Sequence, residues 1–335
     1  MKSKITIKDV ARIAGVSVGT VSNVINGKEN VDPELIEKVN EVMKRVGYHV
    51  NLQARGMALK RSFNIGIVIP TLQDPFFPKF AEYLEEQIEQ RGSHVIITSS
   101  RGDTERERTI IASLQDKSID GIIITPSNRD NIEEINEVIA SGTPVVQLGR
   151  YYHNINAPIV RVDNEFIGKE SADRMIVAGC RNIITISGNQ TSRPDICRTE
   201  GFLDELKNKN PDIECIVINN SDQLSQELKD LLTHNPDIDG IFTIDDPMAM
   251  CALKVCFSLG KSVPKEISII SGASCYSPEI QVQELSSFEL EPKQMANEAV
   301  KLLFQAIDSK KPKIIIPPEV ITIDPVFIQG ETLRE

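Results

Sequence analysis

The chain lacks long hydrophobic runs, closely paired cysteines and clustered histidines. No run of about 18 apolar residues occurs among its 335 residues, so we expect no membrane span. The start, Met1 to Lys4, leads directly into a helical pattern, so we expect no signal peptide and a cytoplasmic protein. Its 6 cysteines include no CxxC pair and are expected to be reduced thiols, mostly buried. Its 4 histidines have no metal-ligand spacing, and we predict neither a metal nor a cofactor.

Motifs of catalysis are absent as well. The sequence contains no GxGxxG, HExxH or GxSxG pattern, so we expect no enzyme. Gly260-Lys261-Ser262 resembles the end of a phosphate loop, but Val255 stands where the first glycine is needed, and we predict a turn that ends a helix. Asp245 and Asp246 could act as paired carboxylates in acid–base chemistry. We favour a role as ligand hydrogen-bonding groups at the C-terminal end of a strand.

Positive charge is concentrated at the N-terminus. Residues 1–61 hold 11 lysines and arginines against 6 acidic residues, whereas the whole chain carries a net charge of −11. A basic segment is the electrostatic signature of phosphate contact, and the acidic remainder should repel DNA. The first 61 residues are therefore predicted to bind nucleic acid.

The segment from Thr6 to Gly27 predicts two short helices joined by a tight turn at Gly15, which is a helix-turn-helix pattern. Thr6 and Asp9 can form a capping box, and Ser17 can cap the second helix. The apolar positions expected to face inward are Val10, Ile13 and Ala14 on the first helix and Val21, Val24 and Ile25 on the second.

The outer face of the second helix is small and polar, with Val18, Gly19, Ser22 and Asn23 free to enter a major groove. Asp32 and Pro33 start a third helix. A three-helix bundle without DNA function is the alternative, and the polarity of that outer face argues against it.

Residues 63–335 alternate β-branched runs with amphipathic helical patterns, which predicts parallel sheets covered on both faces. Runs such as Ile65–Pro70, Gly121–Ile124 and Gly240–Ile244 are expected to be buried strands. The phrase Asp120-Gly-Ile-Ile-Ile recurs as Asp239-Gly-Ile-Phe-Thr-Ile, which indicates two similar lobes.

The run TIKDVARIAGVSVGTVSNVINGKENV and the later VGYHVNLQARGMALKRS resemble the lactose-repressor (LacI) family of bacterial transcription regulators. The resemblance implies an N-terminal helix-turn-helix domain (1–47) and a hinge helix or linker (48–62). It further implies an α/β effector-binding and dimerisation domain (63–335) with two Rossmann-like lobes, as in periplasmic binding proteins. Lobe 1 is expected at about 63–160 and 292–322, and lobe 2 at about 161–291 and 323–335.

In this family a hinge helix inserts an apolar side chain into the minor groove and kinks the duplex. By position that side chain is Met57, where the family usually has Leu. Val50 replaces the usual Pro and Gly56 lies inside the hinge, so we expect a looser free hinge. Asn23 replaces the usual Arg and should favour adenine over guanine. The residues expected to contact DNA are Thr6, Lys8, Ser17, Val18, Gly19, Thr20, Ser22, Asn23, Asn26, Tyr48, Asn51, Ala54, Arg55 and Met57.

The same resemblance places an effector site between the lobes. Phe76 and Phe77 are expected to stack on a sugar ring, although both could belong to the core, and Arg150 could be a surface cation. Ser271-Gly-Ala-Ser274 replaces the family's Gly-Phe-Asp and lacks its carboxylate. This departure counts against a plain sugar and points to a modified or phosphorylated sugar, or to a non-sugar. The resemblance as a whole implies a sugar or sugar phosphate as the effector. The residues expected to bind it are Asp74, Phe76, Phe77, Arg150, Arg198, Asp245 and Ser274.

The prediction is a sequence-specific repressor of carbohydrate-utilisation genes, with a solute-binding protein without DNA function as the alternative. Its expected partners are a pseudo-palindromic operator, a small-molecule effector and a second copy of the chain. A phosphoprotein corepressor, as used by the catabolite control proteins, is a further partner that no specific signature supports. Five apolar residues are expected to line the homodimer interface: Phe80, Leu84, Ile88, Leu253 and Phe257.

Overall fold

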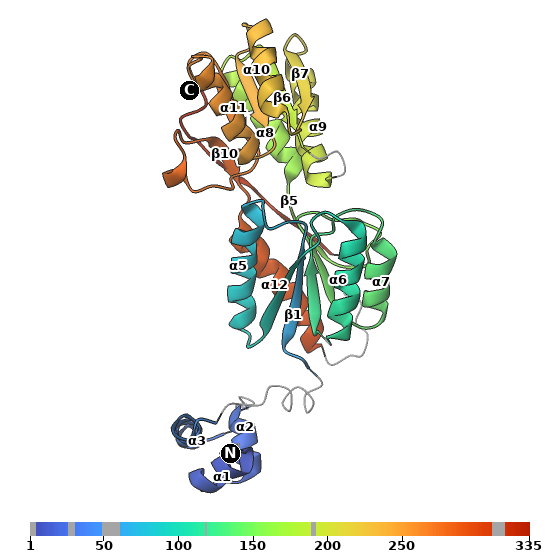
Figure 1. Cartoon of the computed structure of the whole chain (residues 1–335), viewed down its shortest axis with the longest axis vertical. Coiled ribbons are helices and arrows are strands. Elements are labelled where there is room, and N and C mark those ends of the chain that lie inside the picture. Colours follow the sequence, from blue (N-terminus) through green and yellow to red (C-terminus); the bar gives the residue numbers. More distant parts are fainter. Residues whose placement is uncertain (1–4, 26–30, 49–60, 118, 189–191, 310–318) are drawn as a thin grey trace. The chain divides into compact units, whose positions relative to one another are not determined.

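Figure 1 shows a computed structural model of the chain. The structure describes residues 5–25, 31–48, 61–117, 119–188, 192–309 and 319–335. The chain divides into two compact units, Met1–Ser62 and Phe63–Glu335. Most of the expected hinge, residues 49–60, lies outside the described residues.

The N-terminal unit contains the helices α1 (Ile7–Ala14), α2 (Val18–Ile25) and α3 (Pro33–Val46). The three predicted N-terminal caps are present. The Asp9 carboxylate accepts the Thr6 backbone N–H at 3.0 Å, Ser17 Oγ accepts the Thr20 N–H at 3.0 Å, and Asp32 accepts the Glu34 N–H at 2.9 Å. Gly15 ends α1 with φ of 64°, in the left-handed region that glycine adopts readily.

The core of this unit follows the predicted inward faces with one exception. Val10, Ala14 and Val21 are fully buried, as predicted. Ile13 was expected inside but is 37% exposed, whereas Ala11 is 3% exposed. Both residues lie next to Val10 on the helix surface. The direction in which α1 packs against α3 therefore decides that Ala11 is buried and Ile13 is exposed.

In the described residues of the larger unit there are two six-stranded sheets, one in each lobe. The lobe 1 sheet has the order β11-β5-β4-β3-β1-β2, and the lobe 2 sheet has the order β12-β10-β9-β8-β6-β7. All pairings are parallel except that of β12 with β10. The strands are β1 (Asn64–Ile69), β2 (His94–Ser99), β3 (Gly121–Ile124), β4 (Val145–Leu148), β5 (Ile159–Val162), β6 (Asn182–Ser187), β7 (Glu214–Asn219), β8 (Gly240–Thr243), β9 (Ser268–Ser271), β10 (Ser286–Glu289), β11 (Val320–Ile323) and β12 (Val326–Ile328).

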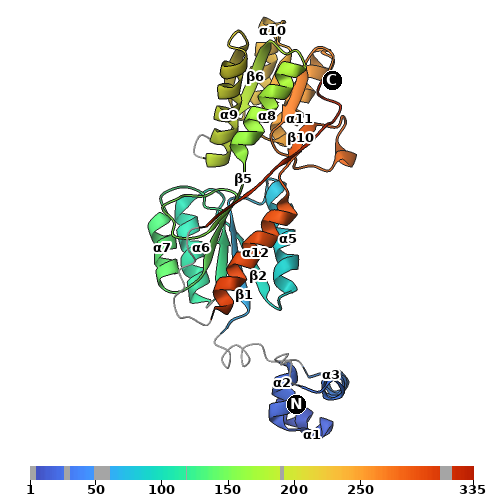
Figure 2. The ribbon, with the colours of Figure 1, turned by 180° about the vertical axis from the view of Figure 1, so that it is seen from behind.

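Helices cover both faces of each sheet, which agrees with the continuous apolar strands (Figures 1 and 2). In lobe 1, α5 and α12 cover one face and α6 and α7 the other; in lobe 2, α8 and α9 pack together, as do α10 and α11. The helices are α5 (Phe76–Glu89), α6 (Thr104–Asp116), α7 (Ile132–Ala140), α8 (Asn164–Val177), α9 (Arg193–Lys209), α10 (Leu224–His234), α11 (Asp246–Ser258) and α12 (Pro292–Asp308), with a short 3-10 helix at Pro278–Ile280. Gly260 follows α11 with φ of 70°, so the Gly-Lys-Ser segment is the helix-ending turn that was predicted.

The repeated Asp-Gly phrase occupies equivalent places in the two lobes. Gly121 starts β3, which pairs with β1, and Gly240 starts β8, which pairs with β6. The Asp120 side chain accepts the Phe63 N–H at 3.0 Å, and the Asp239 side chain accepts the Asn182 N–H at 3.0 Å. Each aspartate therefore fastens the start of the neighbouring strand, which confirms the expected likeness of the lobes.

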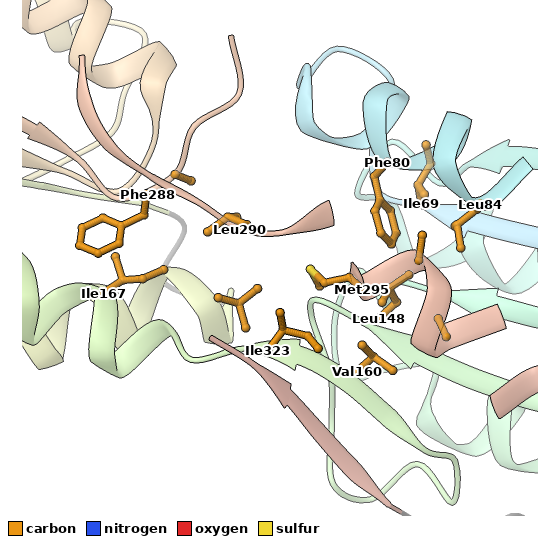
Figure 3. Packing of buried hydrophobic residues seen from close by; sticks show 14 of the residues in the cluster. Ile69, Phe80, Leu84, Leu148, Val160, Ile167, Phe288, Leu290, Met295 and Ile323 are labelled. Carbon is orange, nitrogen blue, oxygen red and sulfur yellow. The ribbon is translucent and has the colours of Figure 1, made fainter. Parts of the chain in front are cut away.

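In the part of the chain that the structure describes, crossings between the lobes lie after β5, between β10 and α12, and between β11 and β12. Figure 3 shows Leu290 and Ile323, from two of these crossings, between Phe288 on the lobe 2 side and Met295 on the lobe 1 side. These four side chains belong to one buried cluster, in which none is more than 5% exposed. The crossings are thus packed in apolar surroundings rather than loosely connected.

The expected dimer interface is wrong for four of its five residues. Phe80, Leu84 and Ile88 are at most 1% exposed, and Leu253 is 2% exposed. They face the sheets that α5 and α11 cover, because an amphipathic helix in an α/β lobe buries its apolar stripe against its own sheet. Only Phe257, at 46% exposure, is open to a partner.

Candidate functional site

The second helix of the N-terminal unit presents the surface that was predicted to read bases. Val18 and Gly19 are exposed, and Ser22 and Asn23 are half-buried. Val21, on the opposite side, is fully buried against the other two helices. The helix is therefore held from behind while its small and polar side stays accessible, as insertion into a major groove requires.

The remaining predicted DNA residues are placed in different ways. Thr6, the N-cap of α1, and Lys8, in the first turn of α1, are exposed, and the Thr6 hydroxyl donates to Asp9 at 2.7 Å. The hydroxyls of Ser17 and Thr20 lie 2.9 Å apart, and Tyr48 packs against the core of the bundle. The others lie outside the described residues: Asn26, Asn51, Ala54, Arg55 and Met57.

A cavity of about 150 Å³ lies between the lobes, at the C-terminal ends of strands from both sheets. Six of the seven residues predicted to bind the effector line it, namely Asp74, Phe76, Phe77, Arg150, Arg198 and Asp245. Ser274 does not. Its backbone N–H donates to the carbonyl of Phe288 at 2.7 Å, and its neighbours Ala273 and Cys275 line the cavity instead.

Arg198 is the central cation of this cavity. It is 6% exposed, and its guanidinium donates from Nε to Asn164 Oδ1 and from Nη1 to the carbonyl of Ile244, both at 2.8 Å. Burial lowers the pKa of Arg198, and the nearby carboxylates of Asp195 and Asp245 oppose that effect. The side chain stays charged, because arginine is not deprotonated in proteins.

Close approach of α8 and α9 puts Arg198 next to Asn164. A Cβ at Gly168 would lie 2.2 Å from the carbonyl oxygen of Arg198, and a Cβ at Gly201 would lie 2.6 Å from that of Glu165. Only glycines permit backbones this close, so these two residues bring the helices together. The close packing of the two helix backbones, rather than an ion pair, therefore places the Arg198 side chain next to Asn164.

Three carboxylates surround this arginine from different elements. Asp74 follows β1 and accepts the Phe76 N–H at 2.9 Å, whereas Asp245 caps α11 and accepts the Met248 N–H at 3.1 Å. Burial raises the pKa of Asp74 and raises that of Asp245 to about 6. Asp195 lines the cavity from the first turn of α9.

Two phenylalanines and a second arginine complete the lining. The rings of Phe76 and Phe77 lie edge to face at 5.4 Å, and Phe76 stacks on Phe80 at 5.7 Å. Both rings are half-buried, so they contribute to the core and also face the cavity. Arg150 donates from Nη1 to the carbonyl of Ser127 at 3.0 Å, and is therefore fixed at the cavity rather than free on the surface.

Sequence reasoning missed Asn164, Asp195 and Cys275 in the lining. Asp195 precedes Arg198 by three residues on one helix, so helical spacing could have indicated it. Asp246 was paired with Asp245 in the sequence but lies behind the cavity. It is fully buried and accepts the backbone N–H groups of Cys275 and Tyr276 at 2.7 and 3.1 Å.

Within the described part of the chain, no cluster of three or more histidine, cysteine, aspartate or glutamate side chains could hold a metal ion. In the same residues, no helix is both long enough and apolar enough to cross a membrane.

A helix-turn-helix unit joined to a two-lobed unit with a polar cavity defines a class of DNA-binding regulator. Comparison with known proteins is consistent with both parts. The description "Bacterial regulatory proteins, lacI family" matches residues 6–51, and "Periplasmic binding protein domain" matches residues 65–311.

Relatives and a solved structure span nearly the whole chain. The ribose operon repressor of Halalkalibacterium halodurans is 31% identical over 91% of this chain and 91% of that protein. Catabolite control protein A of Staphylococcus xylosus is 30% identical over 94% of this chain and 97% of that protein. The fold matches the Lac repressor dimer bound to operator and an anti-inducer, with a TM-score of 0.82 at 20% identity over 99% of this chain and 100% of that chain.

The chain belongs to the lacI family of bacterial regulatory proteins. It is a DNA-binding transcription regulator, and its relatives are regulators rather than enzymes. A solute-binding protein without DNA function is not favoured, because the similarity includes the helix-turn-helix unit.

Proposed function

We propose that the protein is a cytoplasmic repressor of carbohydrate-utilisation genes whose operator binding is controlled by a small sugar in the interlobe cavity. The observation that carries this proposal is the lining around Arg198. Carboxylates accept hydrogen bonds from sugar hydroxyls, the guanidinium donates them, and the paired Phe76 and Phe77 rings offer an apolar surface to a sugar ring. The relationship to a ribose operon repressor supports a carbohydrate system.

The size and charge of the cavity limit the kinds of ligand that it can bind. A cavity of about 150 Å³ accommodates a molecule of about one six-membered ring, which favours a monosaccharide. Its lining contains three aspartates against two arginines. Because the carboxylates outnumber the cations, a neutral sugar fits this cavity better than the sugar phosphate that was the other expectation.

The DNA side of the proposal rests on α2 and on the family resemblance of the hinge. Asn23 on α2 is half-buried, and its amide suits adenine. Met57 stays a prediction as the minor-groove wedge. The operator is expected to be pseudo-palindromic, because a two-fold dimer presents two reading helices about one helical turn of DNA apart.

Homodimerisation is proposed on a revised set of residues. Ile280 and Val282, in the segment between β9 and β10, are 70% and 83% exposed, and Phe257 on α11 is 46% exposed. Burial of such exposed apolar side chains against a second copy of the chain would stabilise a dimer. Sedimentation should show a dimer for the parent and a monomer for Ile280→Asp/Val282→Asp, and a monomeric parent would contradict the proposal.

The function is tested in two steps. A thermal-shift screen of monosaccharides identifies a stabilising sugar, because a ligand that binds the folded state raises its stability. Gel-shift titrations with genomic operator fragments then measure whether that sugar changes DNA affinity. Arg198→Ala should lose the sugar response. Its matched control is Arg181→Gln, which removes an exposed arginine of the same lobe and should respond like the parent. If the parent protein binds operator DNA but no sugar changes its affinity, the proposed effector class is contradicted, whereas the proposed DNA function still stands.

A further inference from the structure

A second cavity, of about 390 Å³, lies beside the effector cavity and has the opposite charge. It is lined by Arg129, Ile132, Tyr151, Tyr152, His153, Asn154, Arg193 and Ile196. Two arginines and a histidine line it, and none of the described residues in its lining is acidic. The whole chain has a net charge of −11, whereas the described lining of this cavity contains cationic side chains and no carboxylate. A lining of this charge favours an anionic ligand.

Guanidinium groups from both lobes contact Tyr151, which lines this cavity. Arg161 of β5 donates from Nη1 to the Tyr151 hydroxyl and also lies over the Tyr151 ring, with its Cζ 5.2 Å from the centroid. Arg193 of α9 has a raised pKa because of Cys197 and because of a hydrogen bond to Tyr151. Tyr151 is only 5% exposed, so two guanidinium groups meet at a buried hydroxyl.

Glu165 and Glu200 are carboxylates that act electrostatically on these arginines. Glu165 is close enough to Arg161 and Arg193 for both to lower its pKa, but its carboxylate forms an ion pair with Lys169 at 2.6 Å, and that contact lowers the pKa most. The described lining itself contains Arg129 and Arg193 and no carboxylate. The first turn of α9, which begins at Arg193, adds the positive end of a 17-residue helix.

The loop that forms the cavity wall is held in place by two amide side chains. Gln147 is fully buried, and its Oε1 accepts the Tyr152 N–H at 2.8 Å while its Nε2 donates to the carbonyl of Ala157 at 3.3 Å. Asn136 of α7 donates to the carbonyl of Asn154 at 2.9 Å and accepts the Asn156 N–H at 2.8 Å. A wall fixed at both ends is preorganised for a ligand, which lowers the cost of binding.

We propose that this second cavity is a binding site for a phosphate group, either as free phosphate or as a small phosphate monoester. The fork of a guanidinium matches phosphate oxygens, and Arg129 and Arg193 supply one fork from each lobe. The volume exceeds that of phosphate alone and leaves room for a small organic remainder. The site is distinct from the sugar cavity, whose three aspartates repel an anion.

Phosphate binding to the full chain tests this proposal. Calorimetric titrations at constant ionic strength use inorganic phosphate and glycerol 3-phosphate, with glycerol as the uncharged reference. The parent is expected to bind phosphate, and Arg129→Gln/Arg193→Gln to bind it about a hundredfold more weakly, about tenfold for each lost charge-assisted contact. Equal affinity for the two probes identifies free phosphate, and tighter binding of glycerol 3-phosphate identifies a monoester.

Two control proteins locate the site. Arg101→Gln/Arg181→Gln removes one exposed arginine from each lobe outside the cavity and should bind phosphate like the parent. Arg198→Ala removes the cation of the sugar cavity and should also retain phosphate binding. The proposal is overturned if the parent binds neither probe at millimolar concentration, if the Arg129/Arg193 variant binds like the parent, or if Arg198→Ala abolishes binding. Circular dichroism confirms that each variant is folded.

Discussion

Asp245→Asn should stabilise the protein at neutral pH, although it removes a charge that faces Arg198. Burial raises the pKa of Asp245 to about 6 from an ordinary value of 3.8, and the attraction of Arg198 is already included in that balance. The difference corresponds to about 3 kcal/mol for an ionised carboxylate at pH 7.5. Because the side chain still opens on the cavity, solvent screening reduces this to about 1–2 kcal/mol.

The sign of the pH dependence follows from the direction of the shift. The folded pKa lies above the unfolded one, so the stabilising contribution of the Asp245 carboxyl is present below pH 3.8 and is lost as the pH rises through about 6. Asparagine carries no charge at any of these pH values and can still accept the Met248 N–H at the start of α11. The stability of Asp245→Asn relative to that of the parent should therefore increase between pH 4 and pH 7.5.

Thermal unfolding of parent and variant across this pH range provides the measurement. At pH 7.5 the Tm of Asp245→Asn should lie about 2–6 °C above that of the parent, and the two should converge near pH 4. Asp212→Asn is the matched control, because Asp212 is exposed and should give no difference at either pH. A variant that is less stable at pH 7.5, or a difference that does not vary with pH, would refute the reasoning.

Three further outcomes are expected. Gly201→Ala should lower stability by about 1–3 kcal/mol in denaturant titrations, because its Cβ would meet the carbonyl of Glu165 at 2.6 Å, whereas Gly19→Ala should not lower it. Arg198→Ala should abolish the sugar response in gel shifts but leave operator affinity unchanged; a lost operator affinity would instead show a structural role. Lys8→Ala should weaken binding to all DNA alike and reduce the salt slope by about one, and a loss confined to the operator would contradict simple phosphate contact.

The order of elements was predictable because strand and helix periodicities differ. The run from Gly121 to Ile124 is apolar without interruption, and it forms a strand buried on both faces. Capping residues such as Ser17 act through bonds to groups three residues away, so the sequence alone reveals them. The helix-turn-helix and the parallel sheets follow from such local rules.

Burial was harder to assign where two faces of a helix are equally apolar. Ile13 and Ala11 both suit the inward stripe of α1, and the packing against α3 decides between them. The apolar residues of α5 were expected at a dimer interface, but Phe80 packs against the sheet of its own lobe. Amphipathicity shows that a helix has a buried face but does not say what covers it.

By itself, the sequence determined the class of protein, the strands, the caps and most of the residues that line the cavity, because each depends on neighbours along the chain or on a specific motif. Only the tertiary structure decided that Asn164 would orient Arg198, that Cys275 would take the place expected for Ser274, and that guanidinium groups from β5 and α9 would meet at Tyr151. These contacts join segments far apart in the chain, and their geometry depends on how two helices and two lobes pack, which no local pattern records.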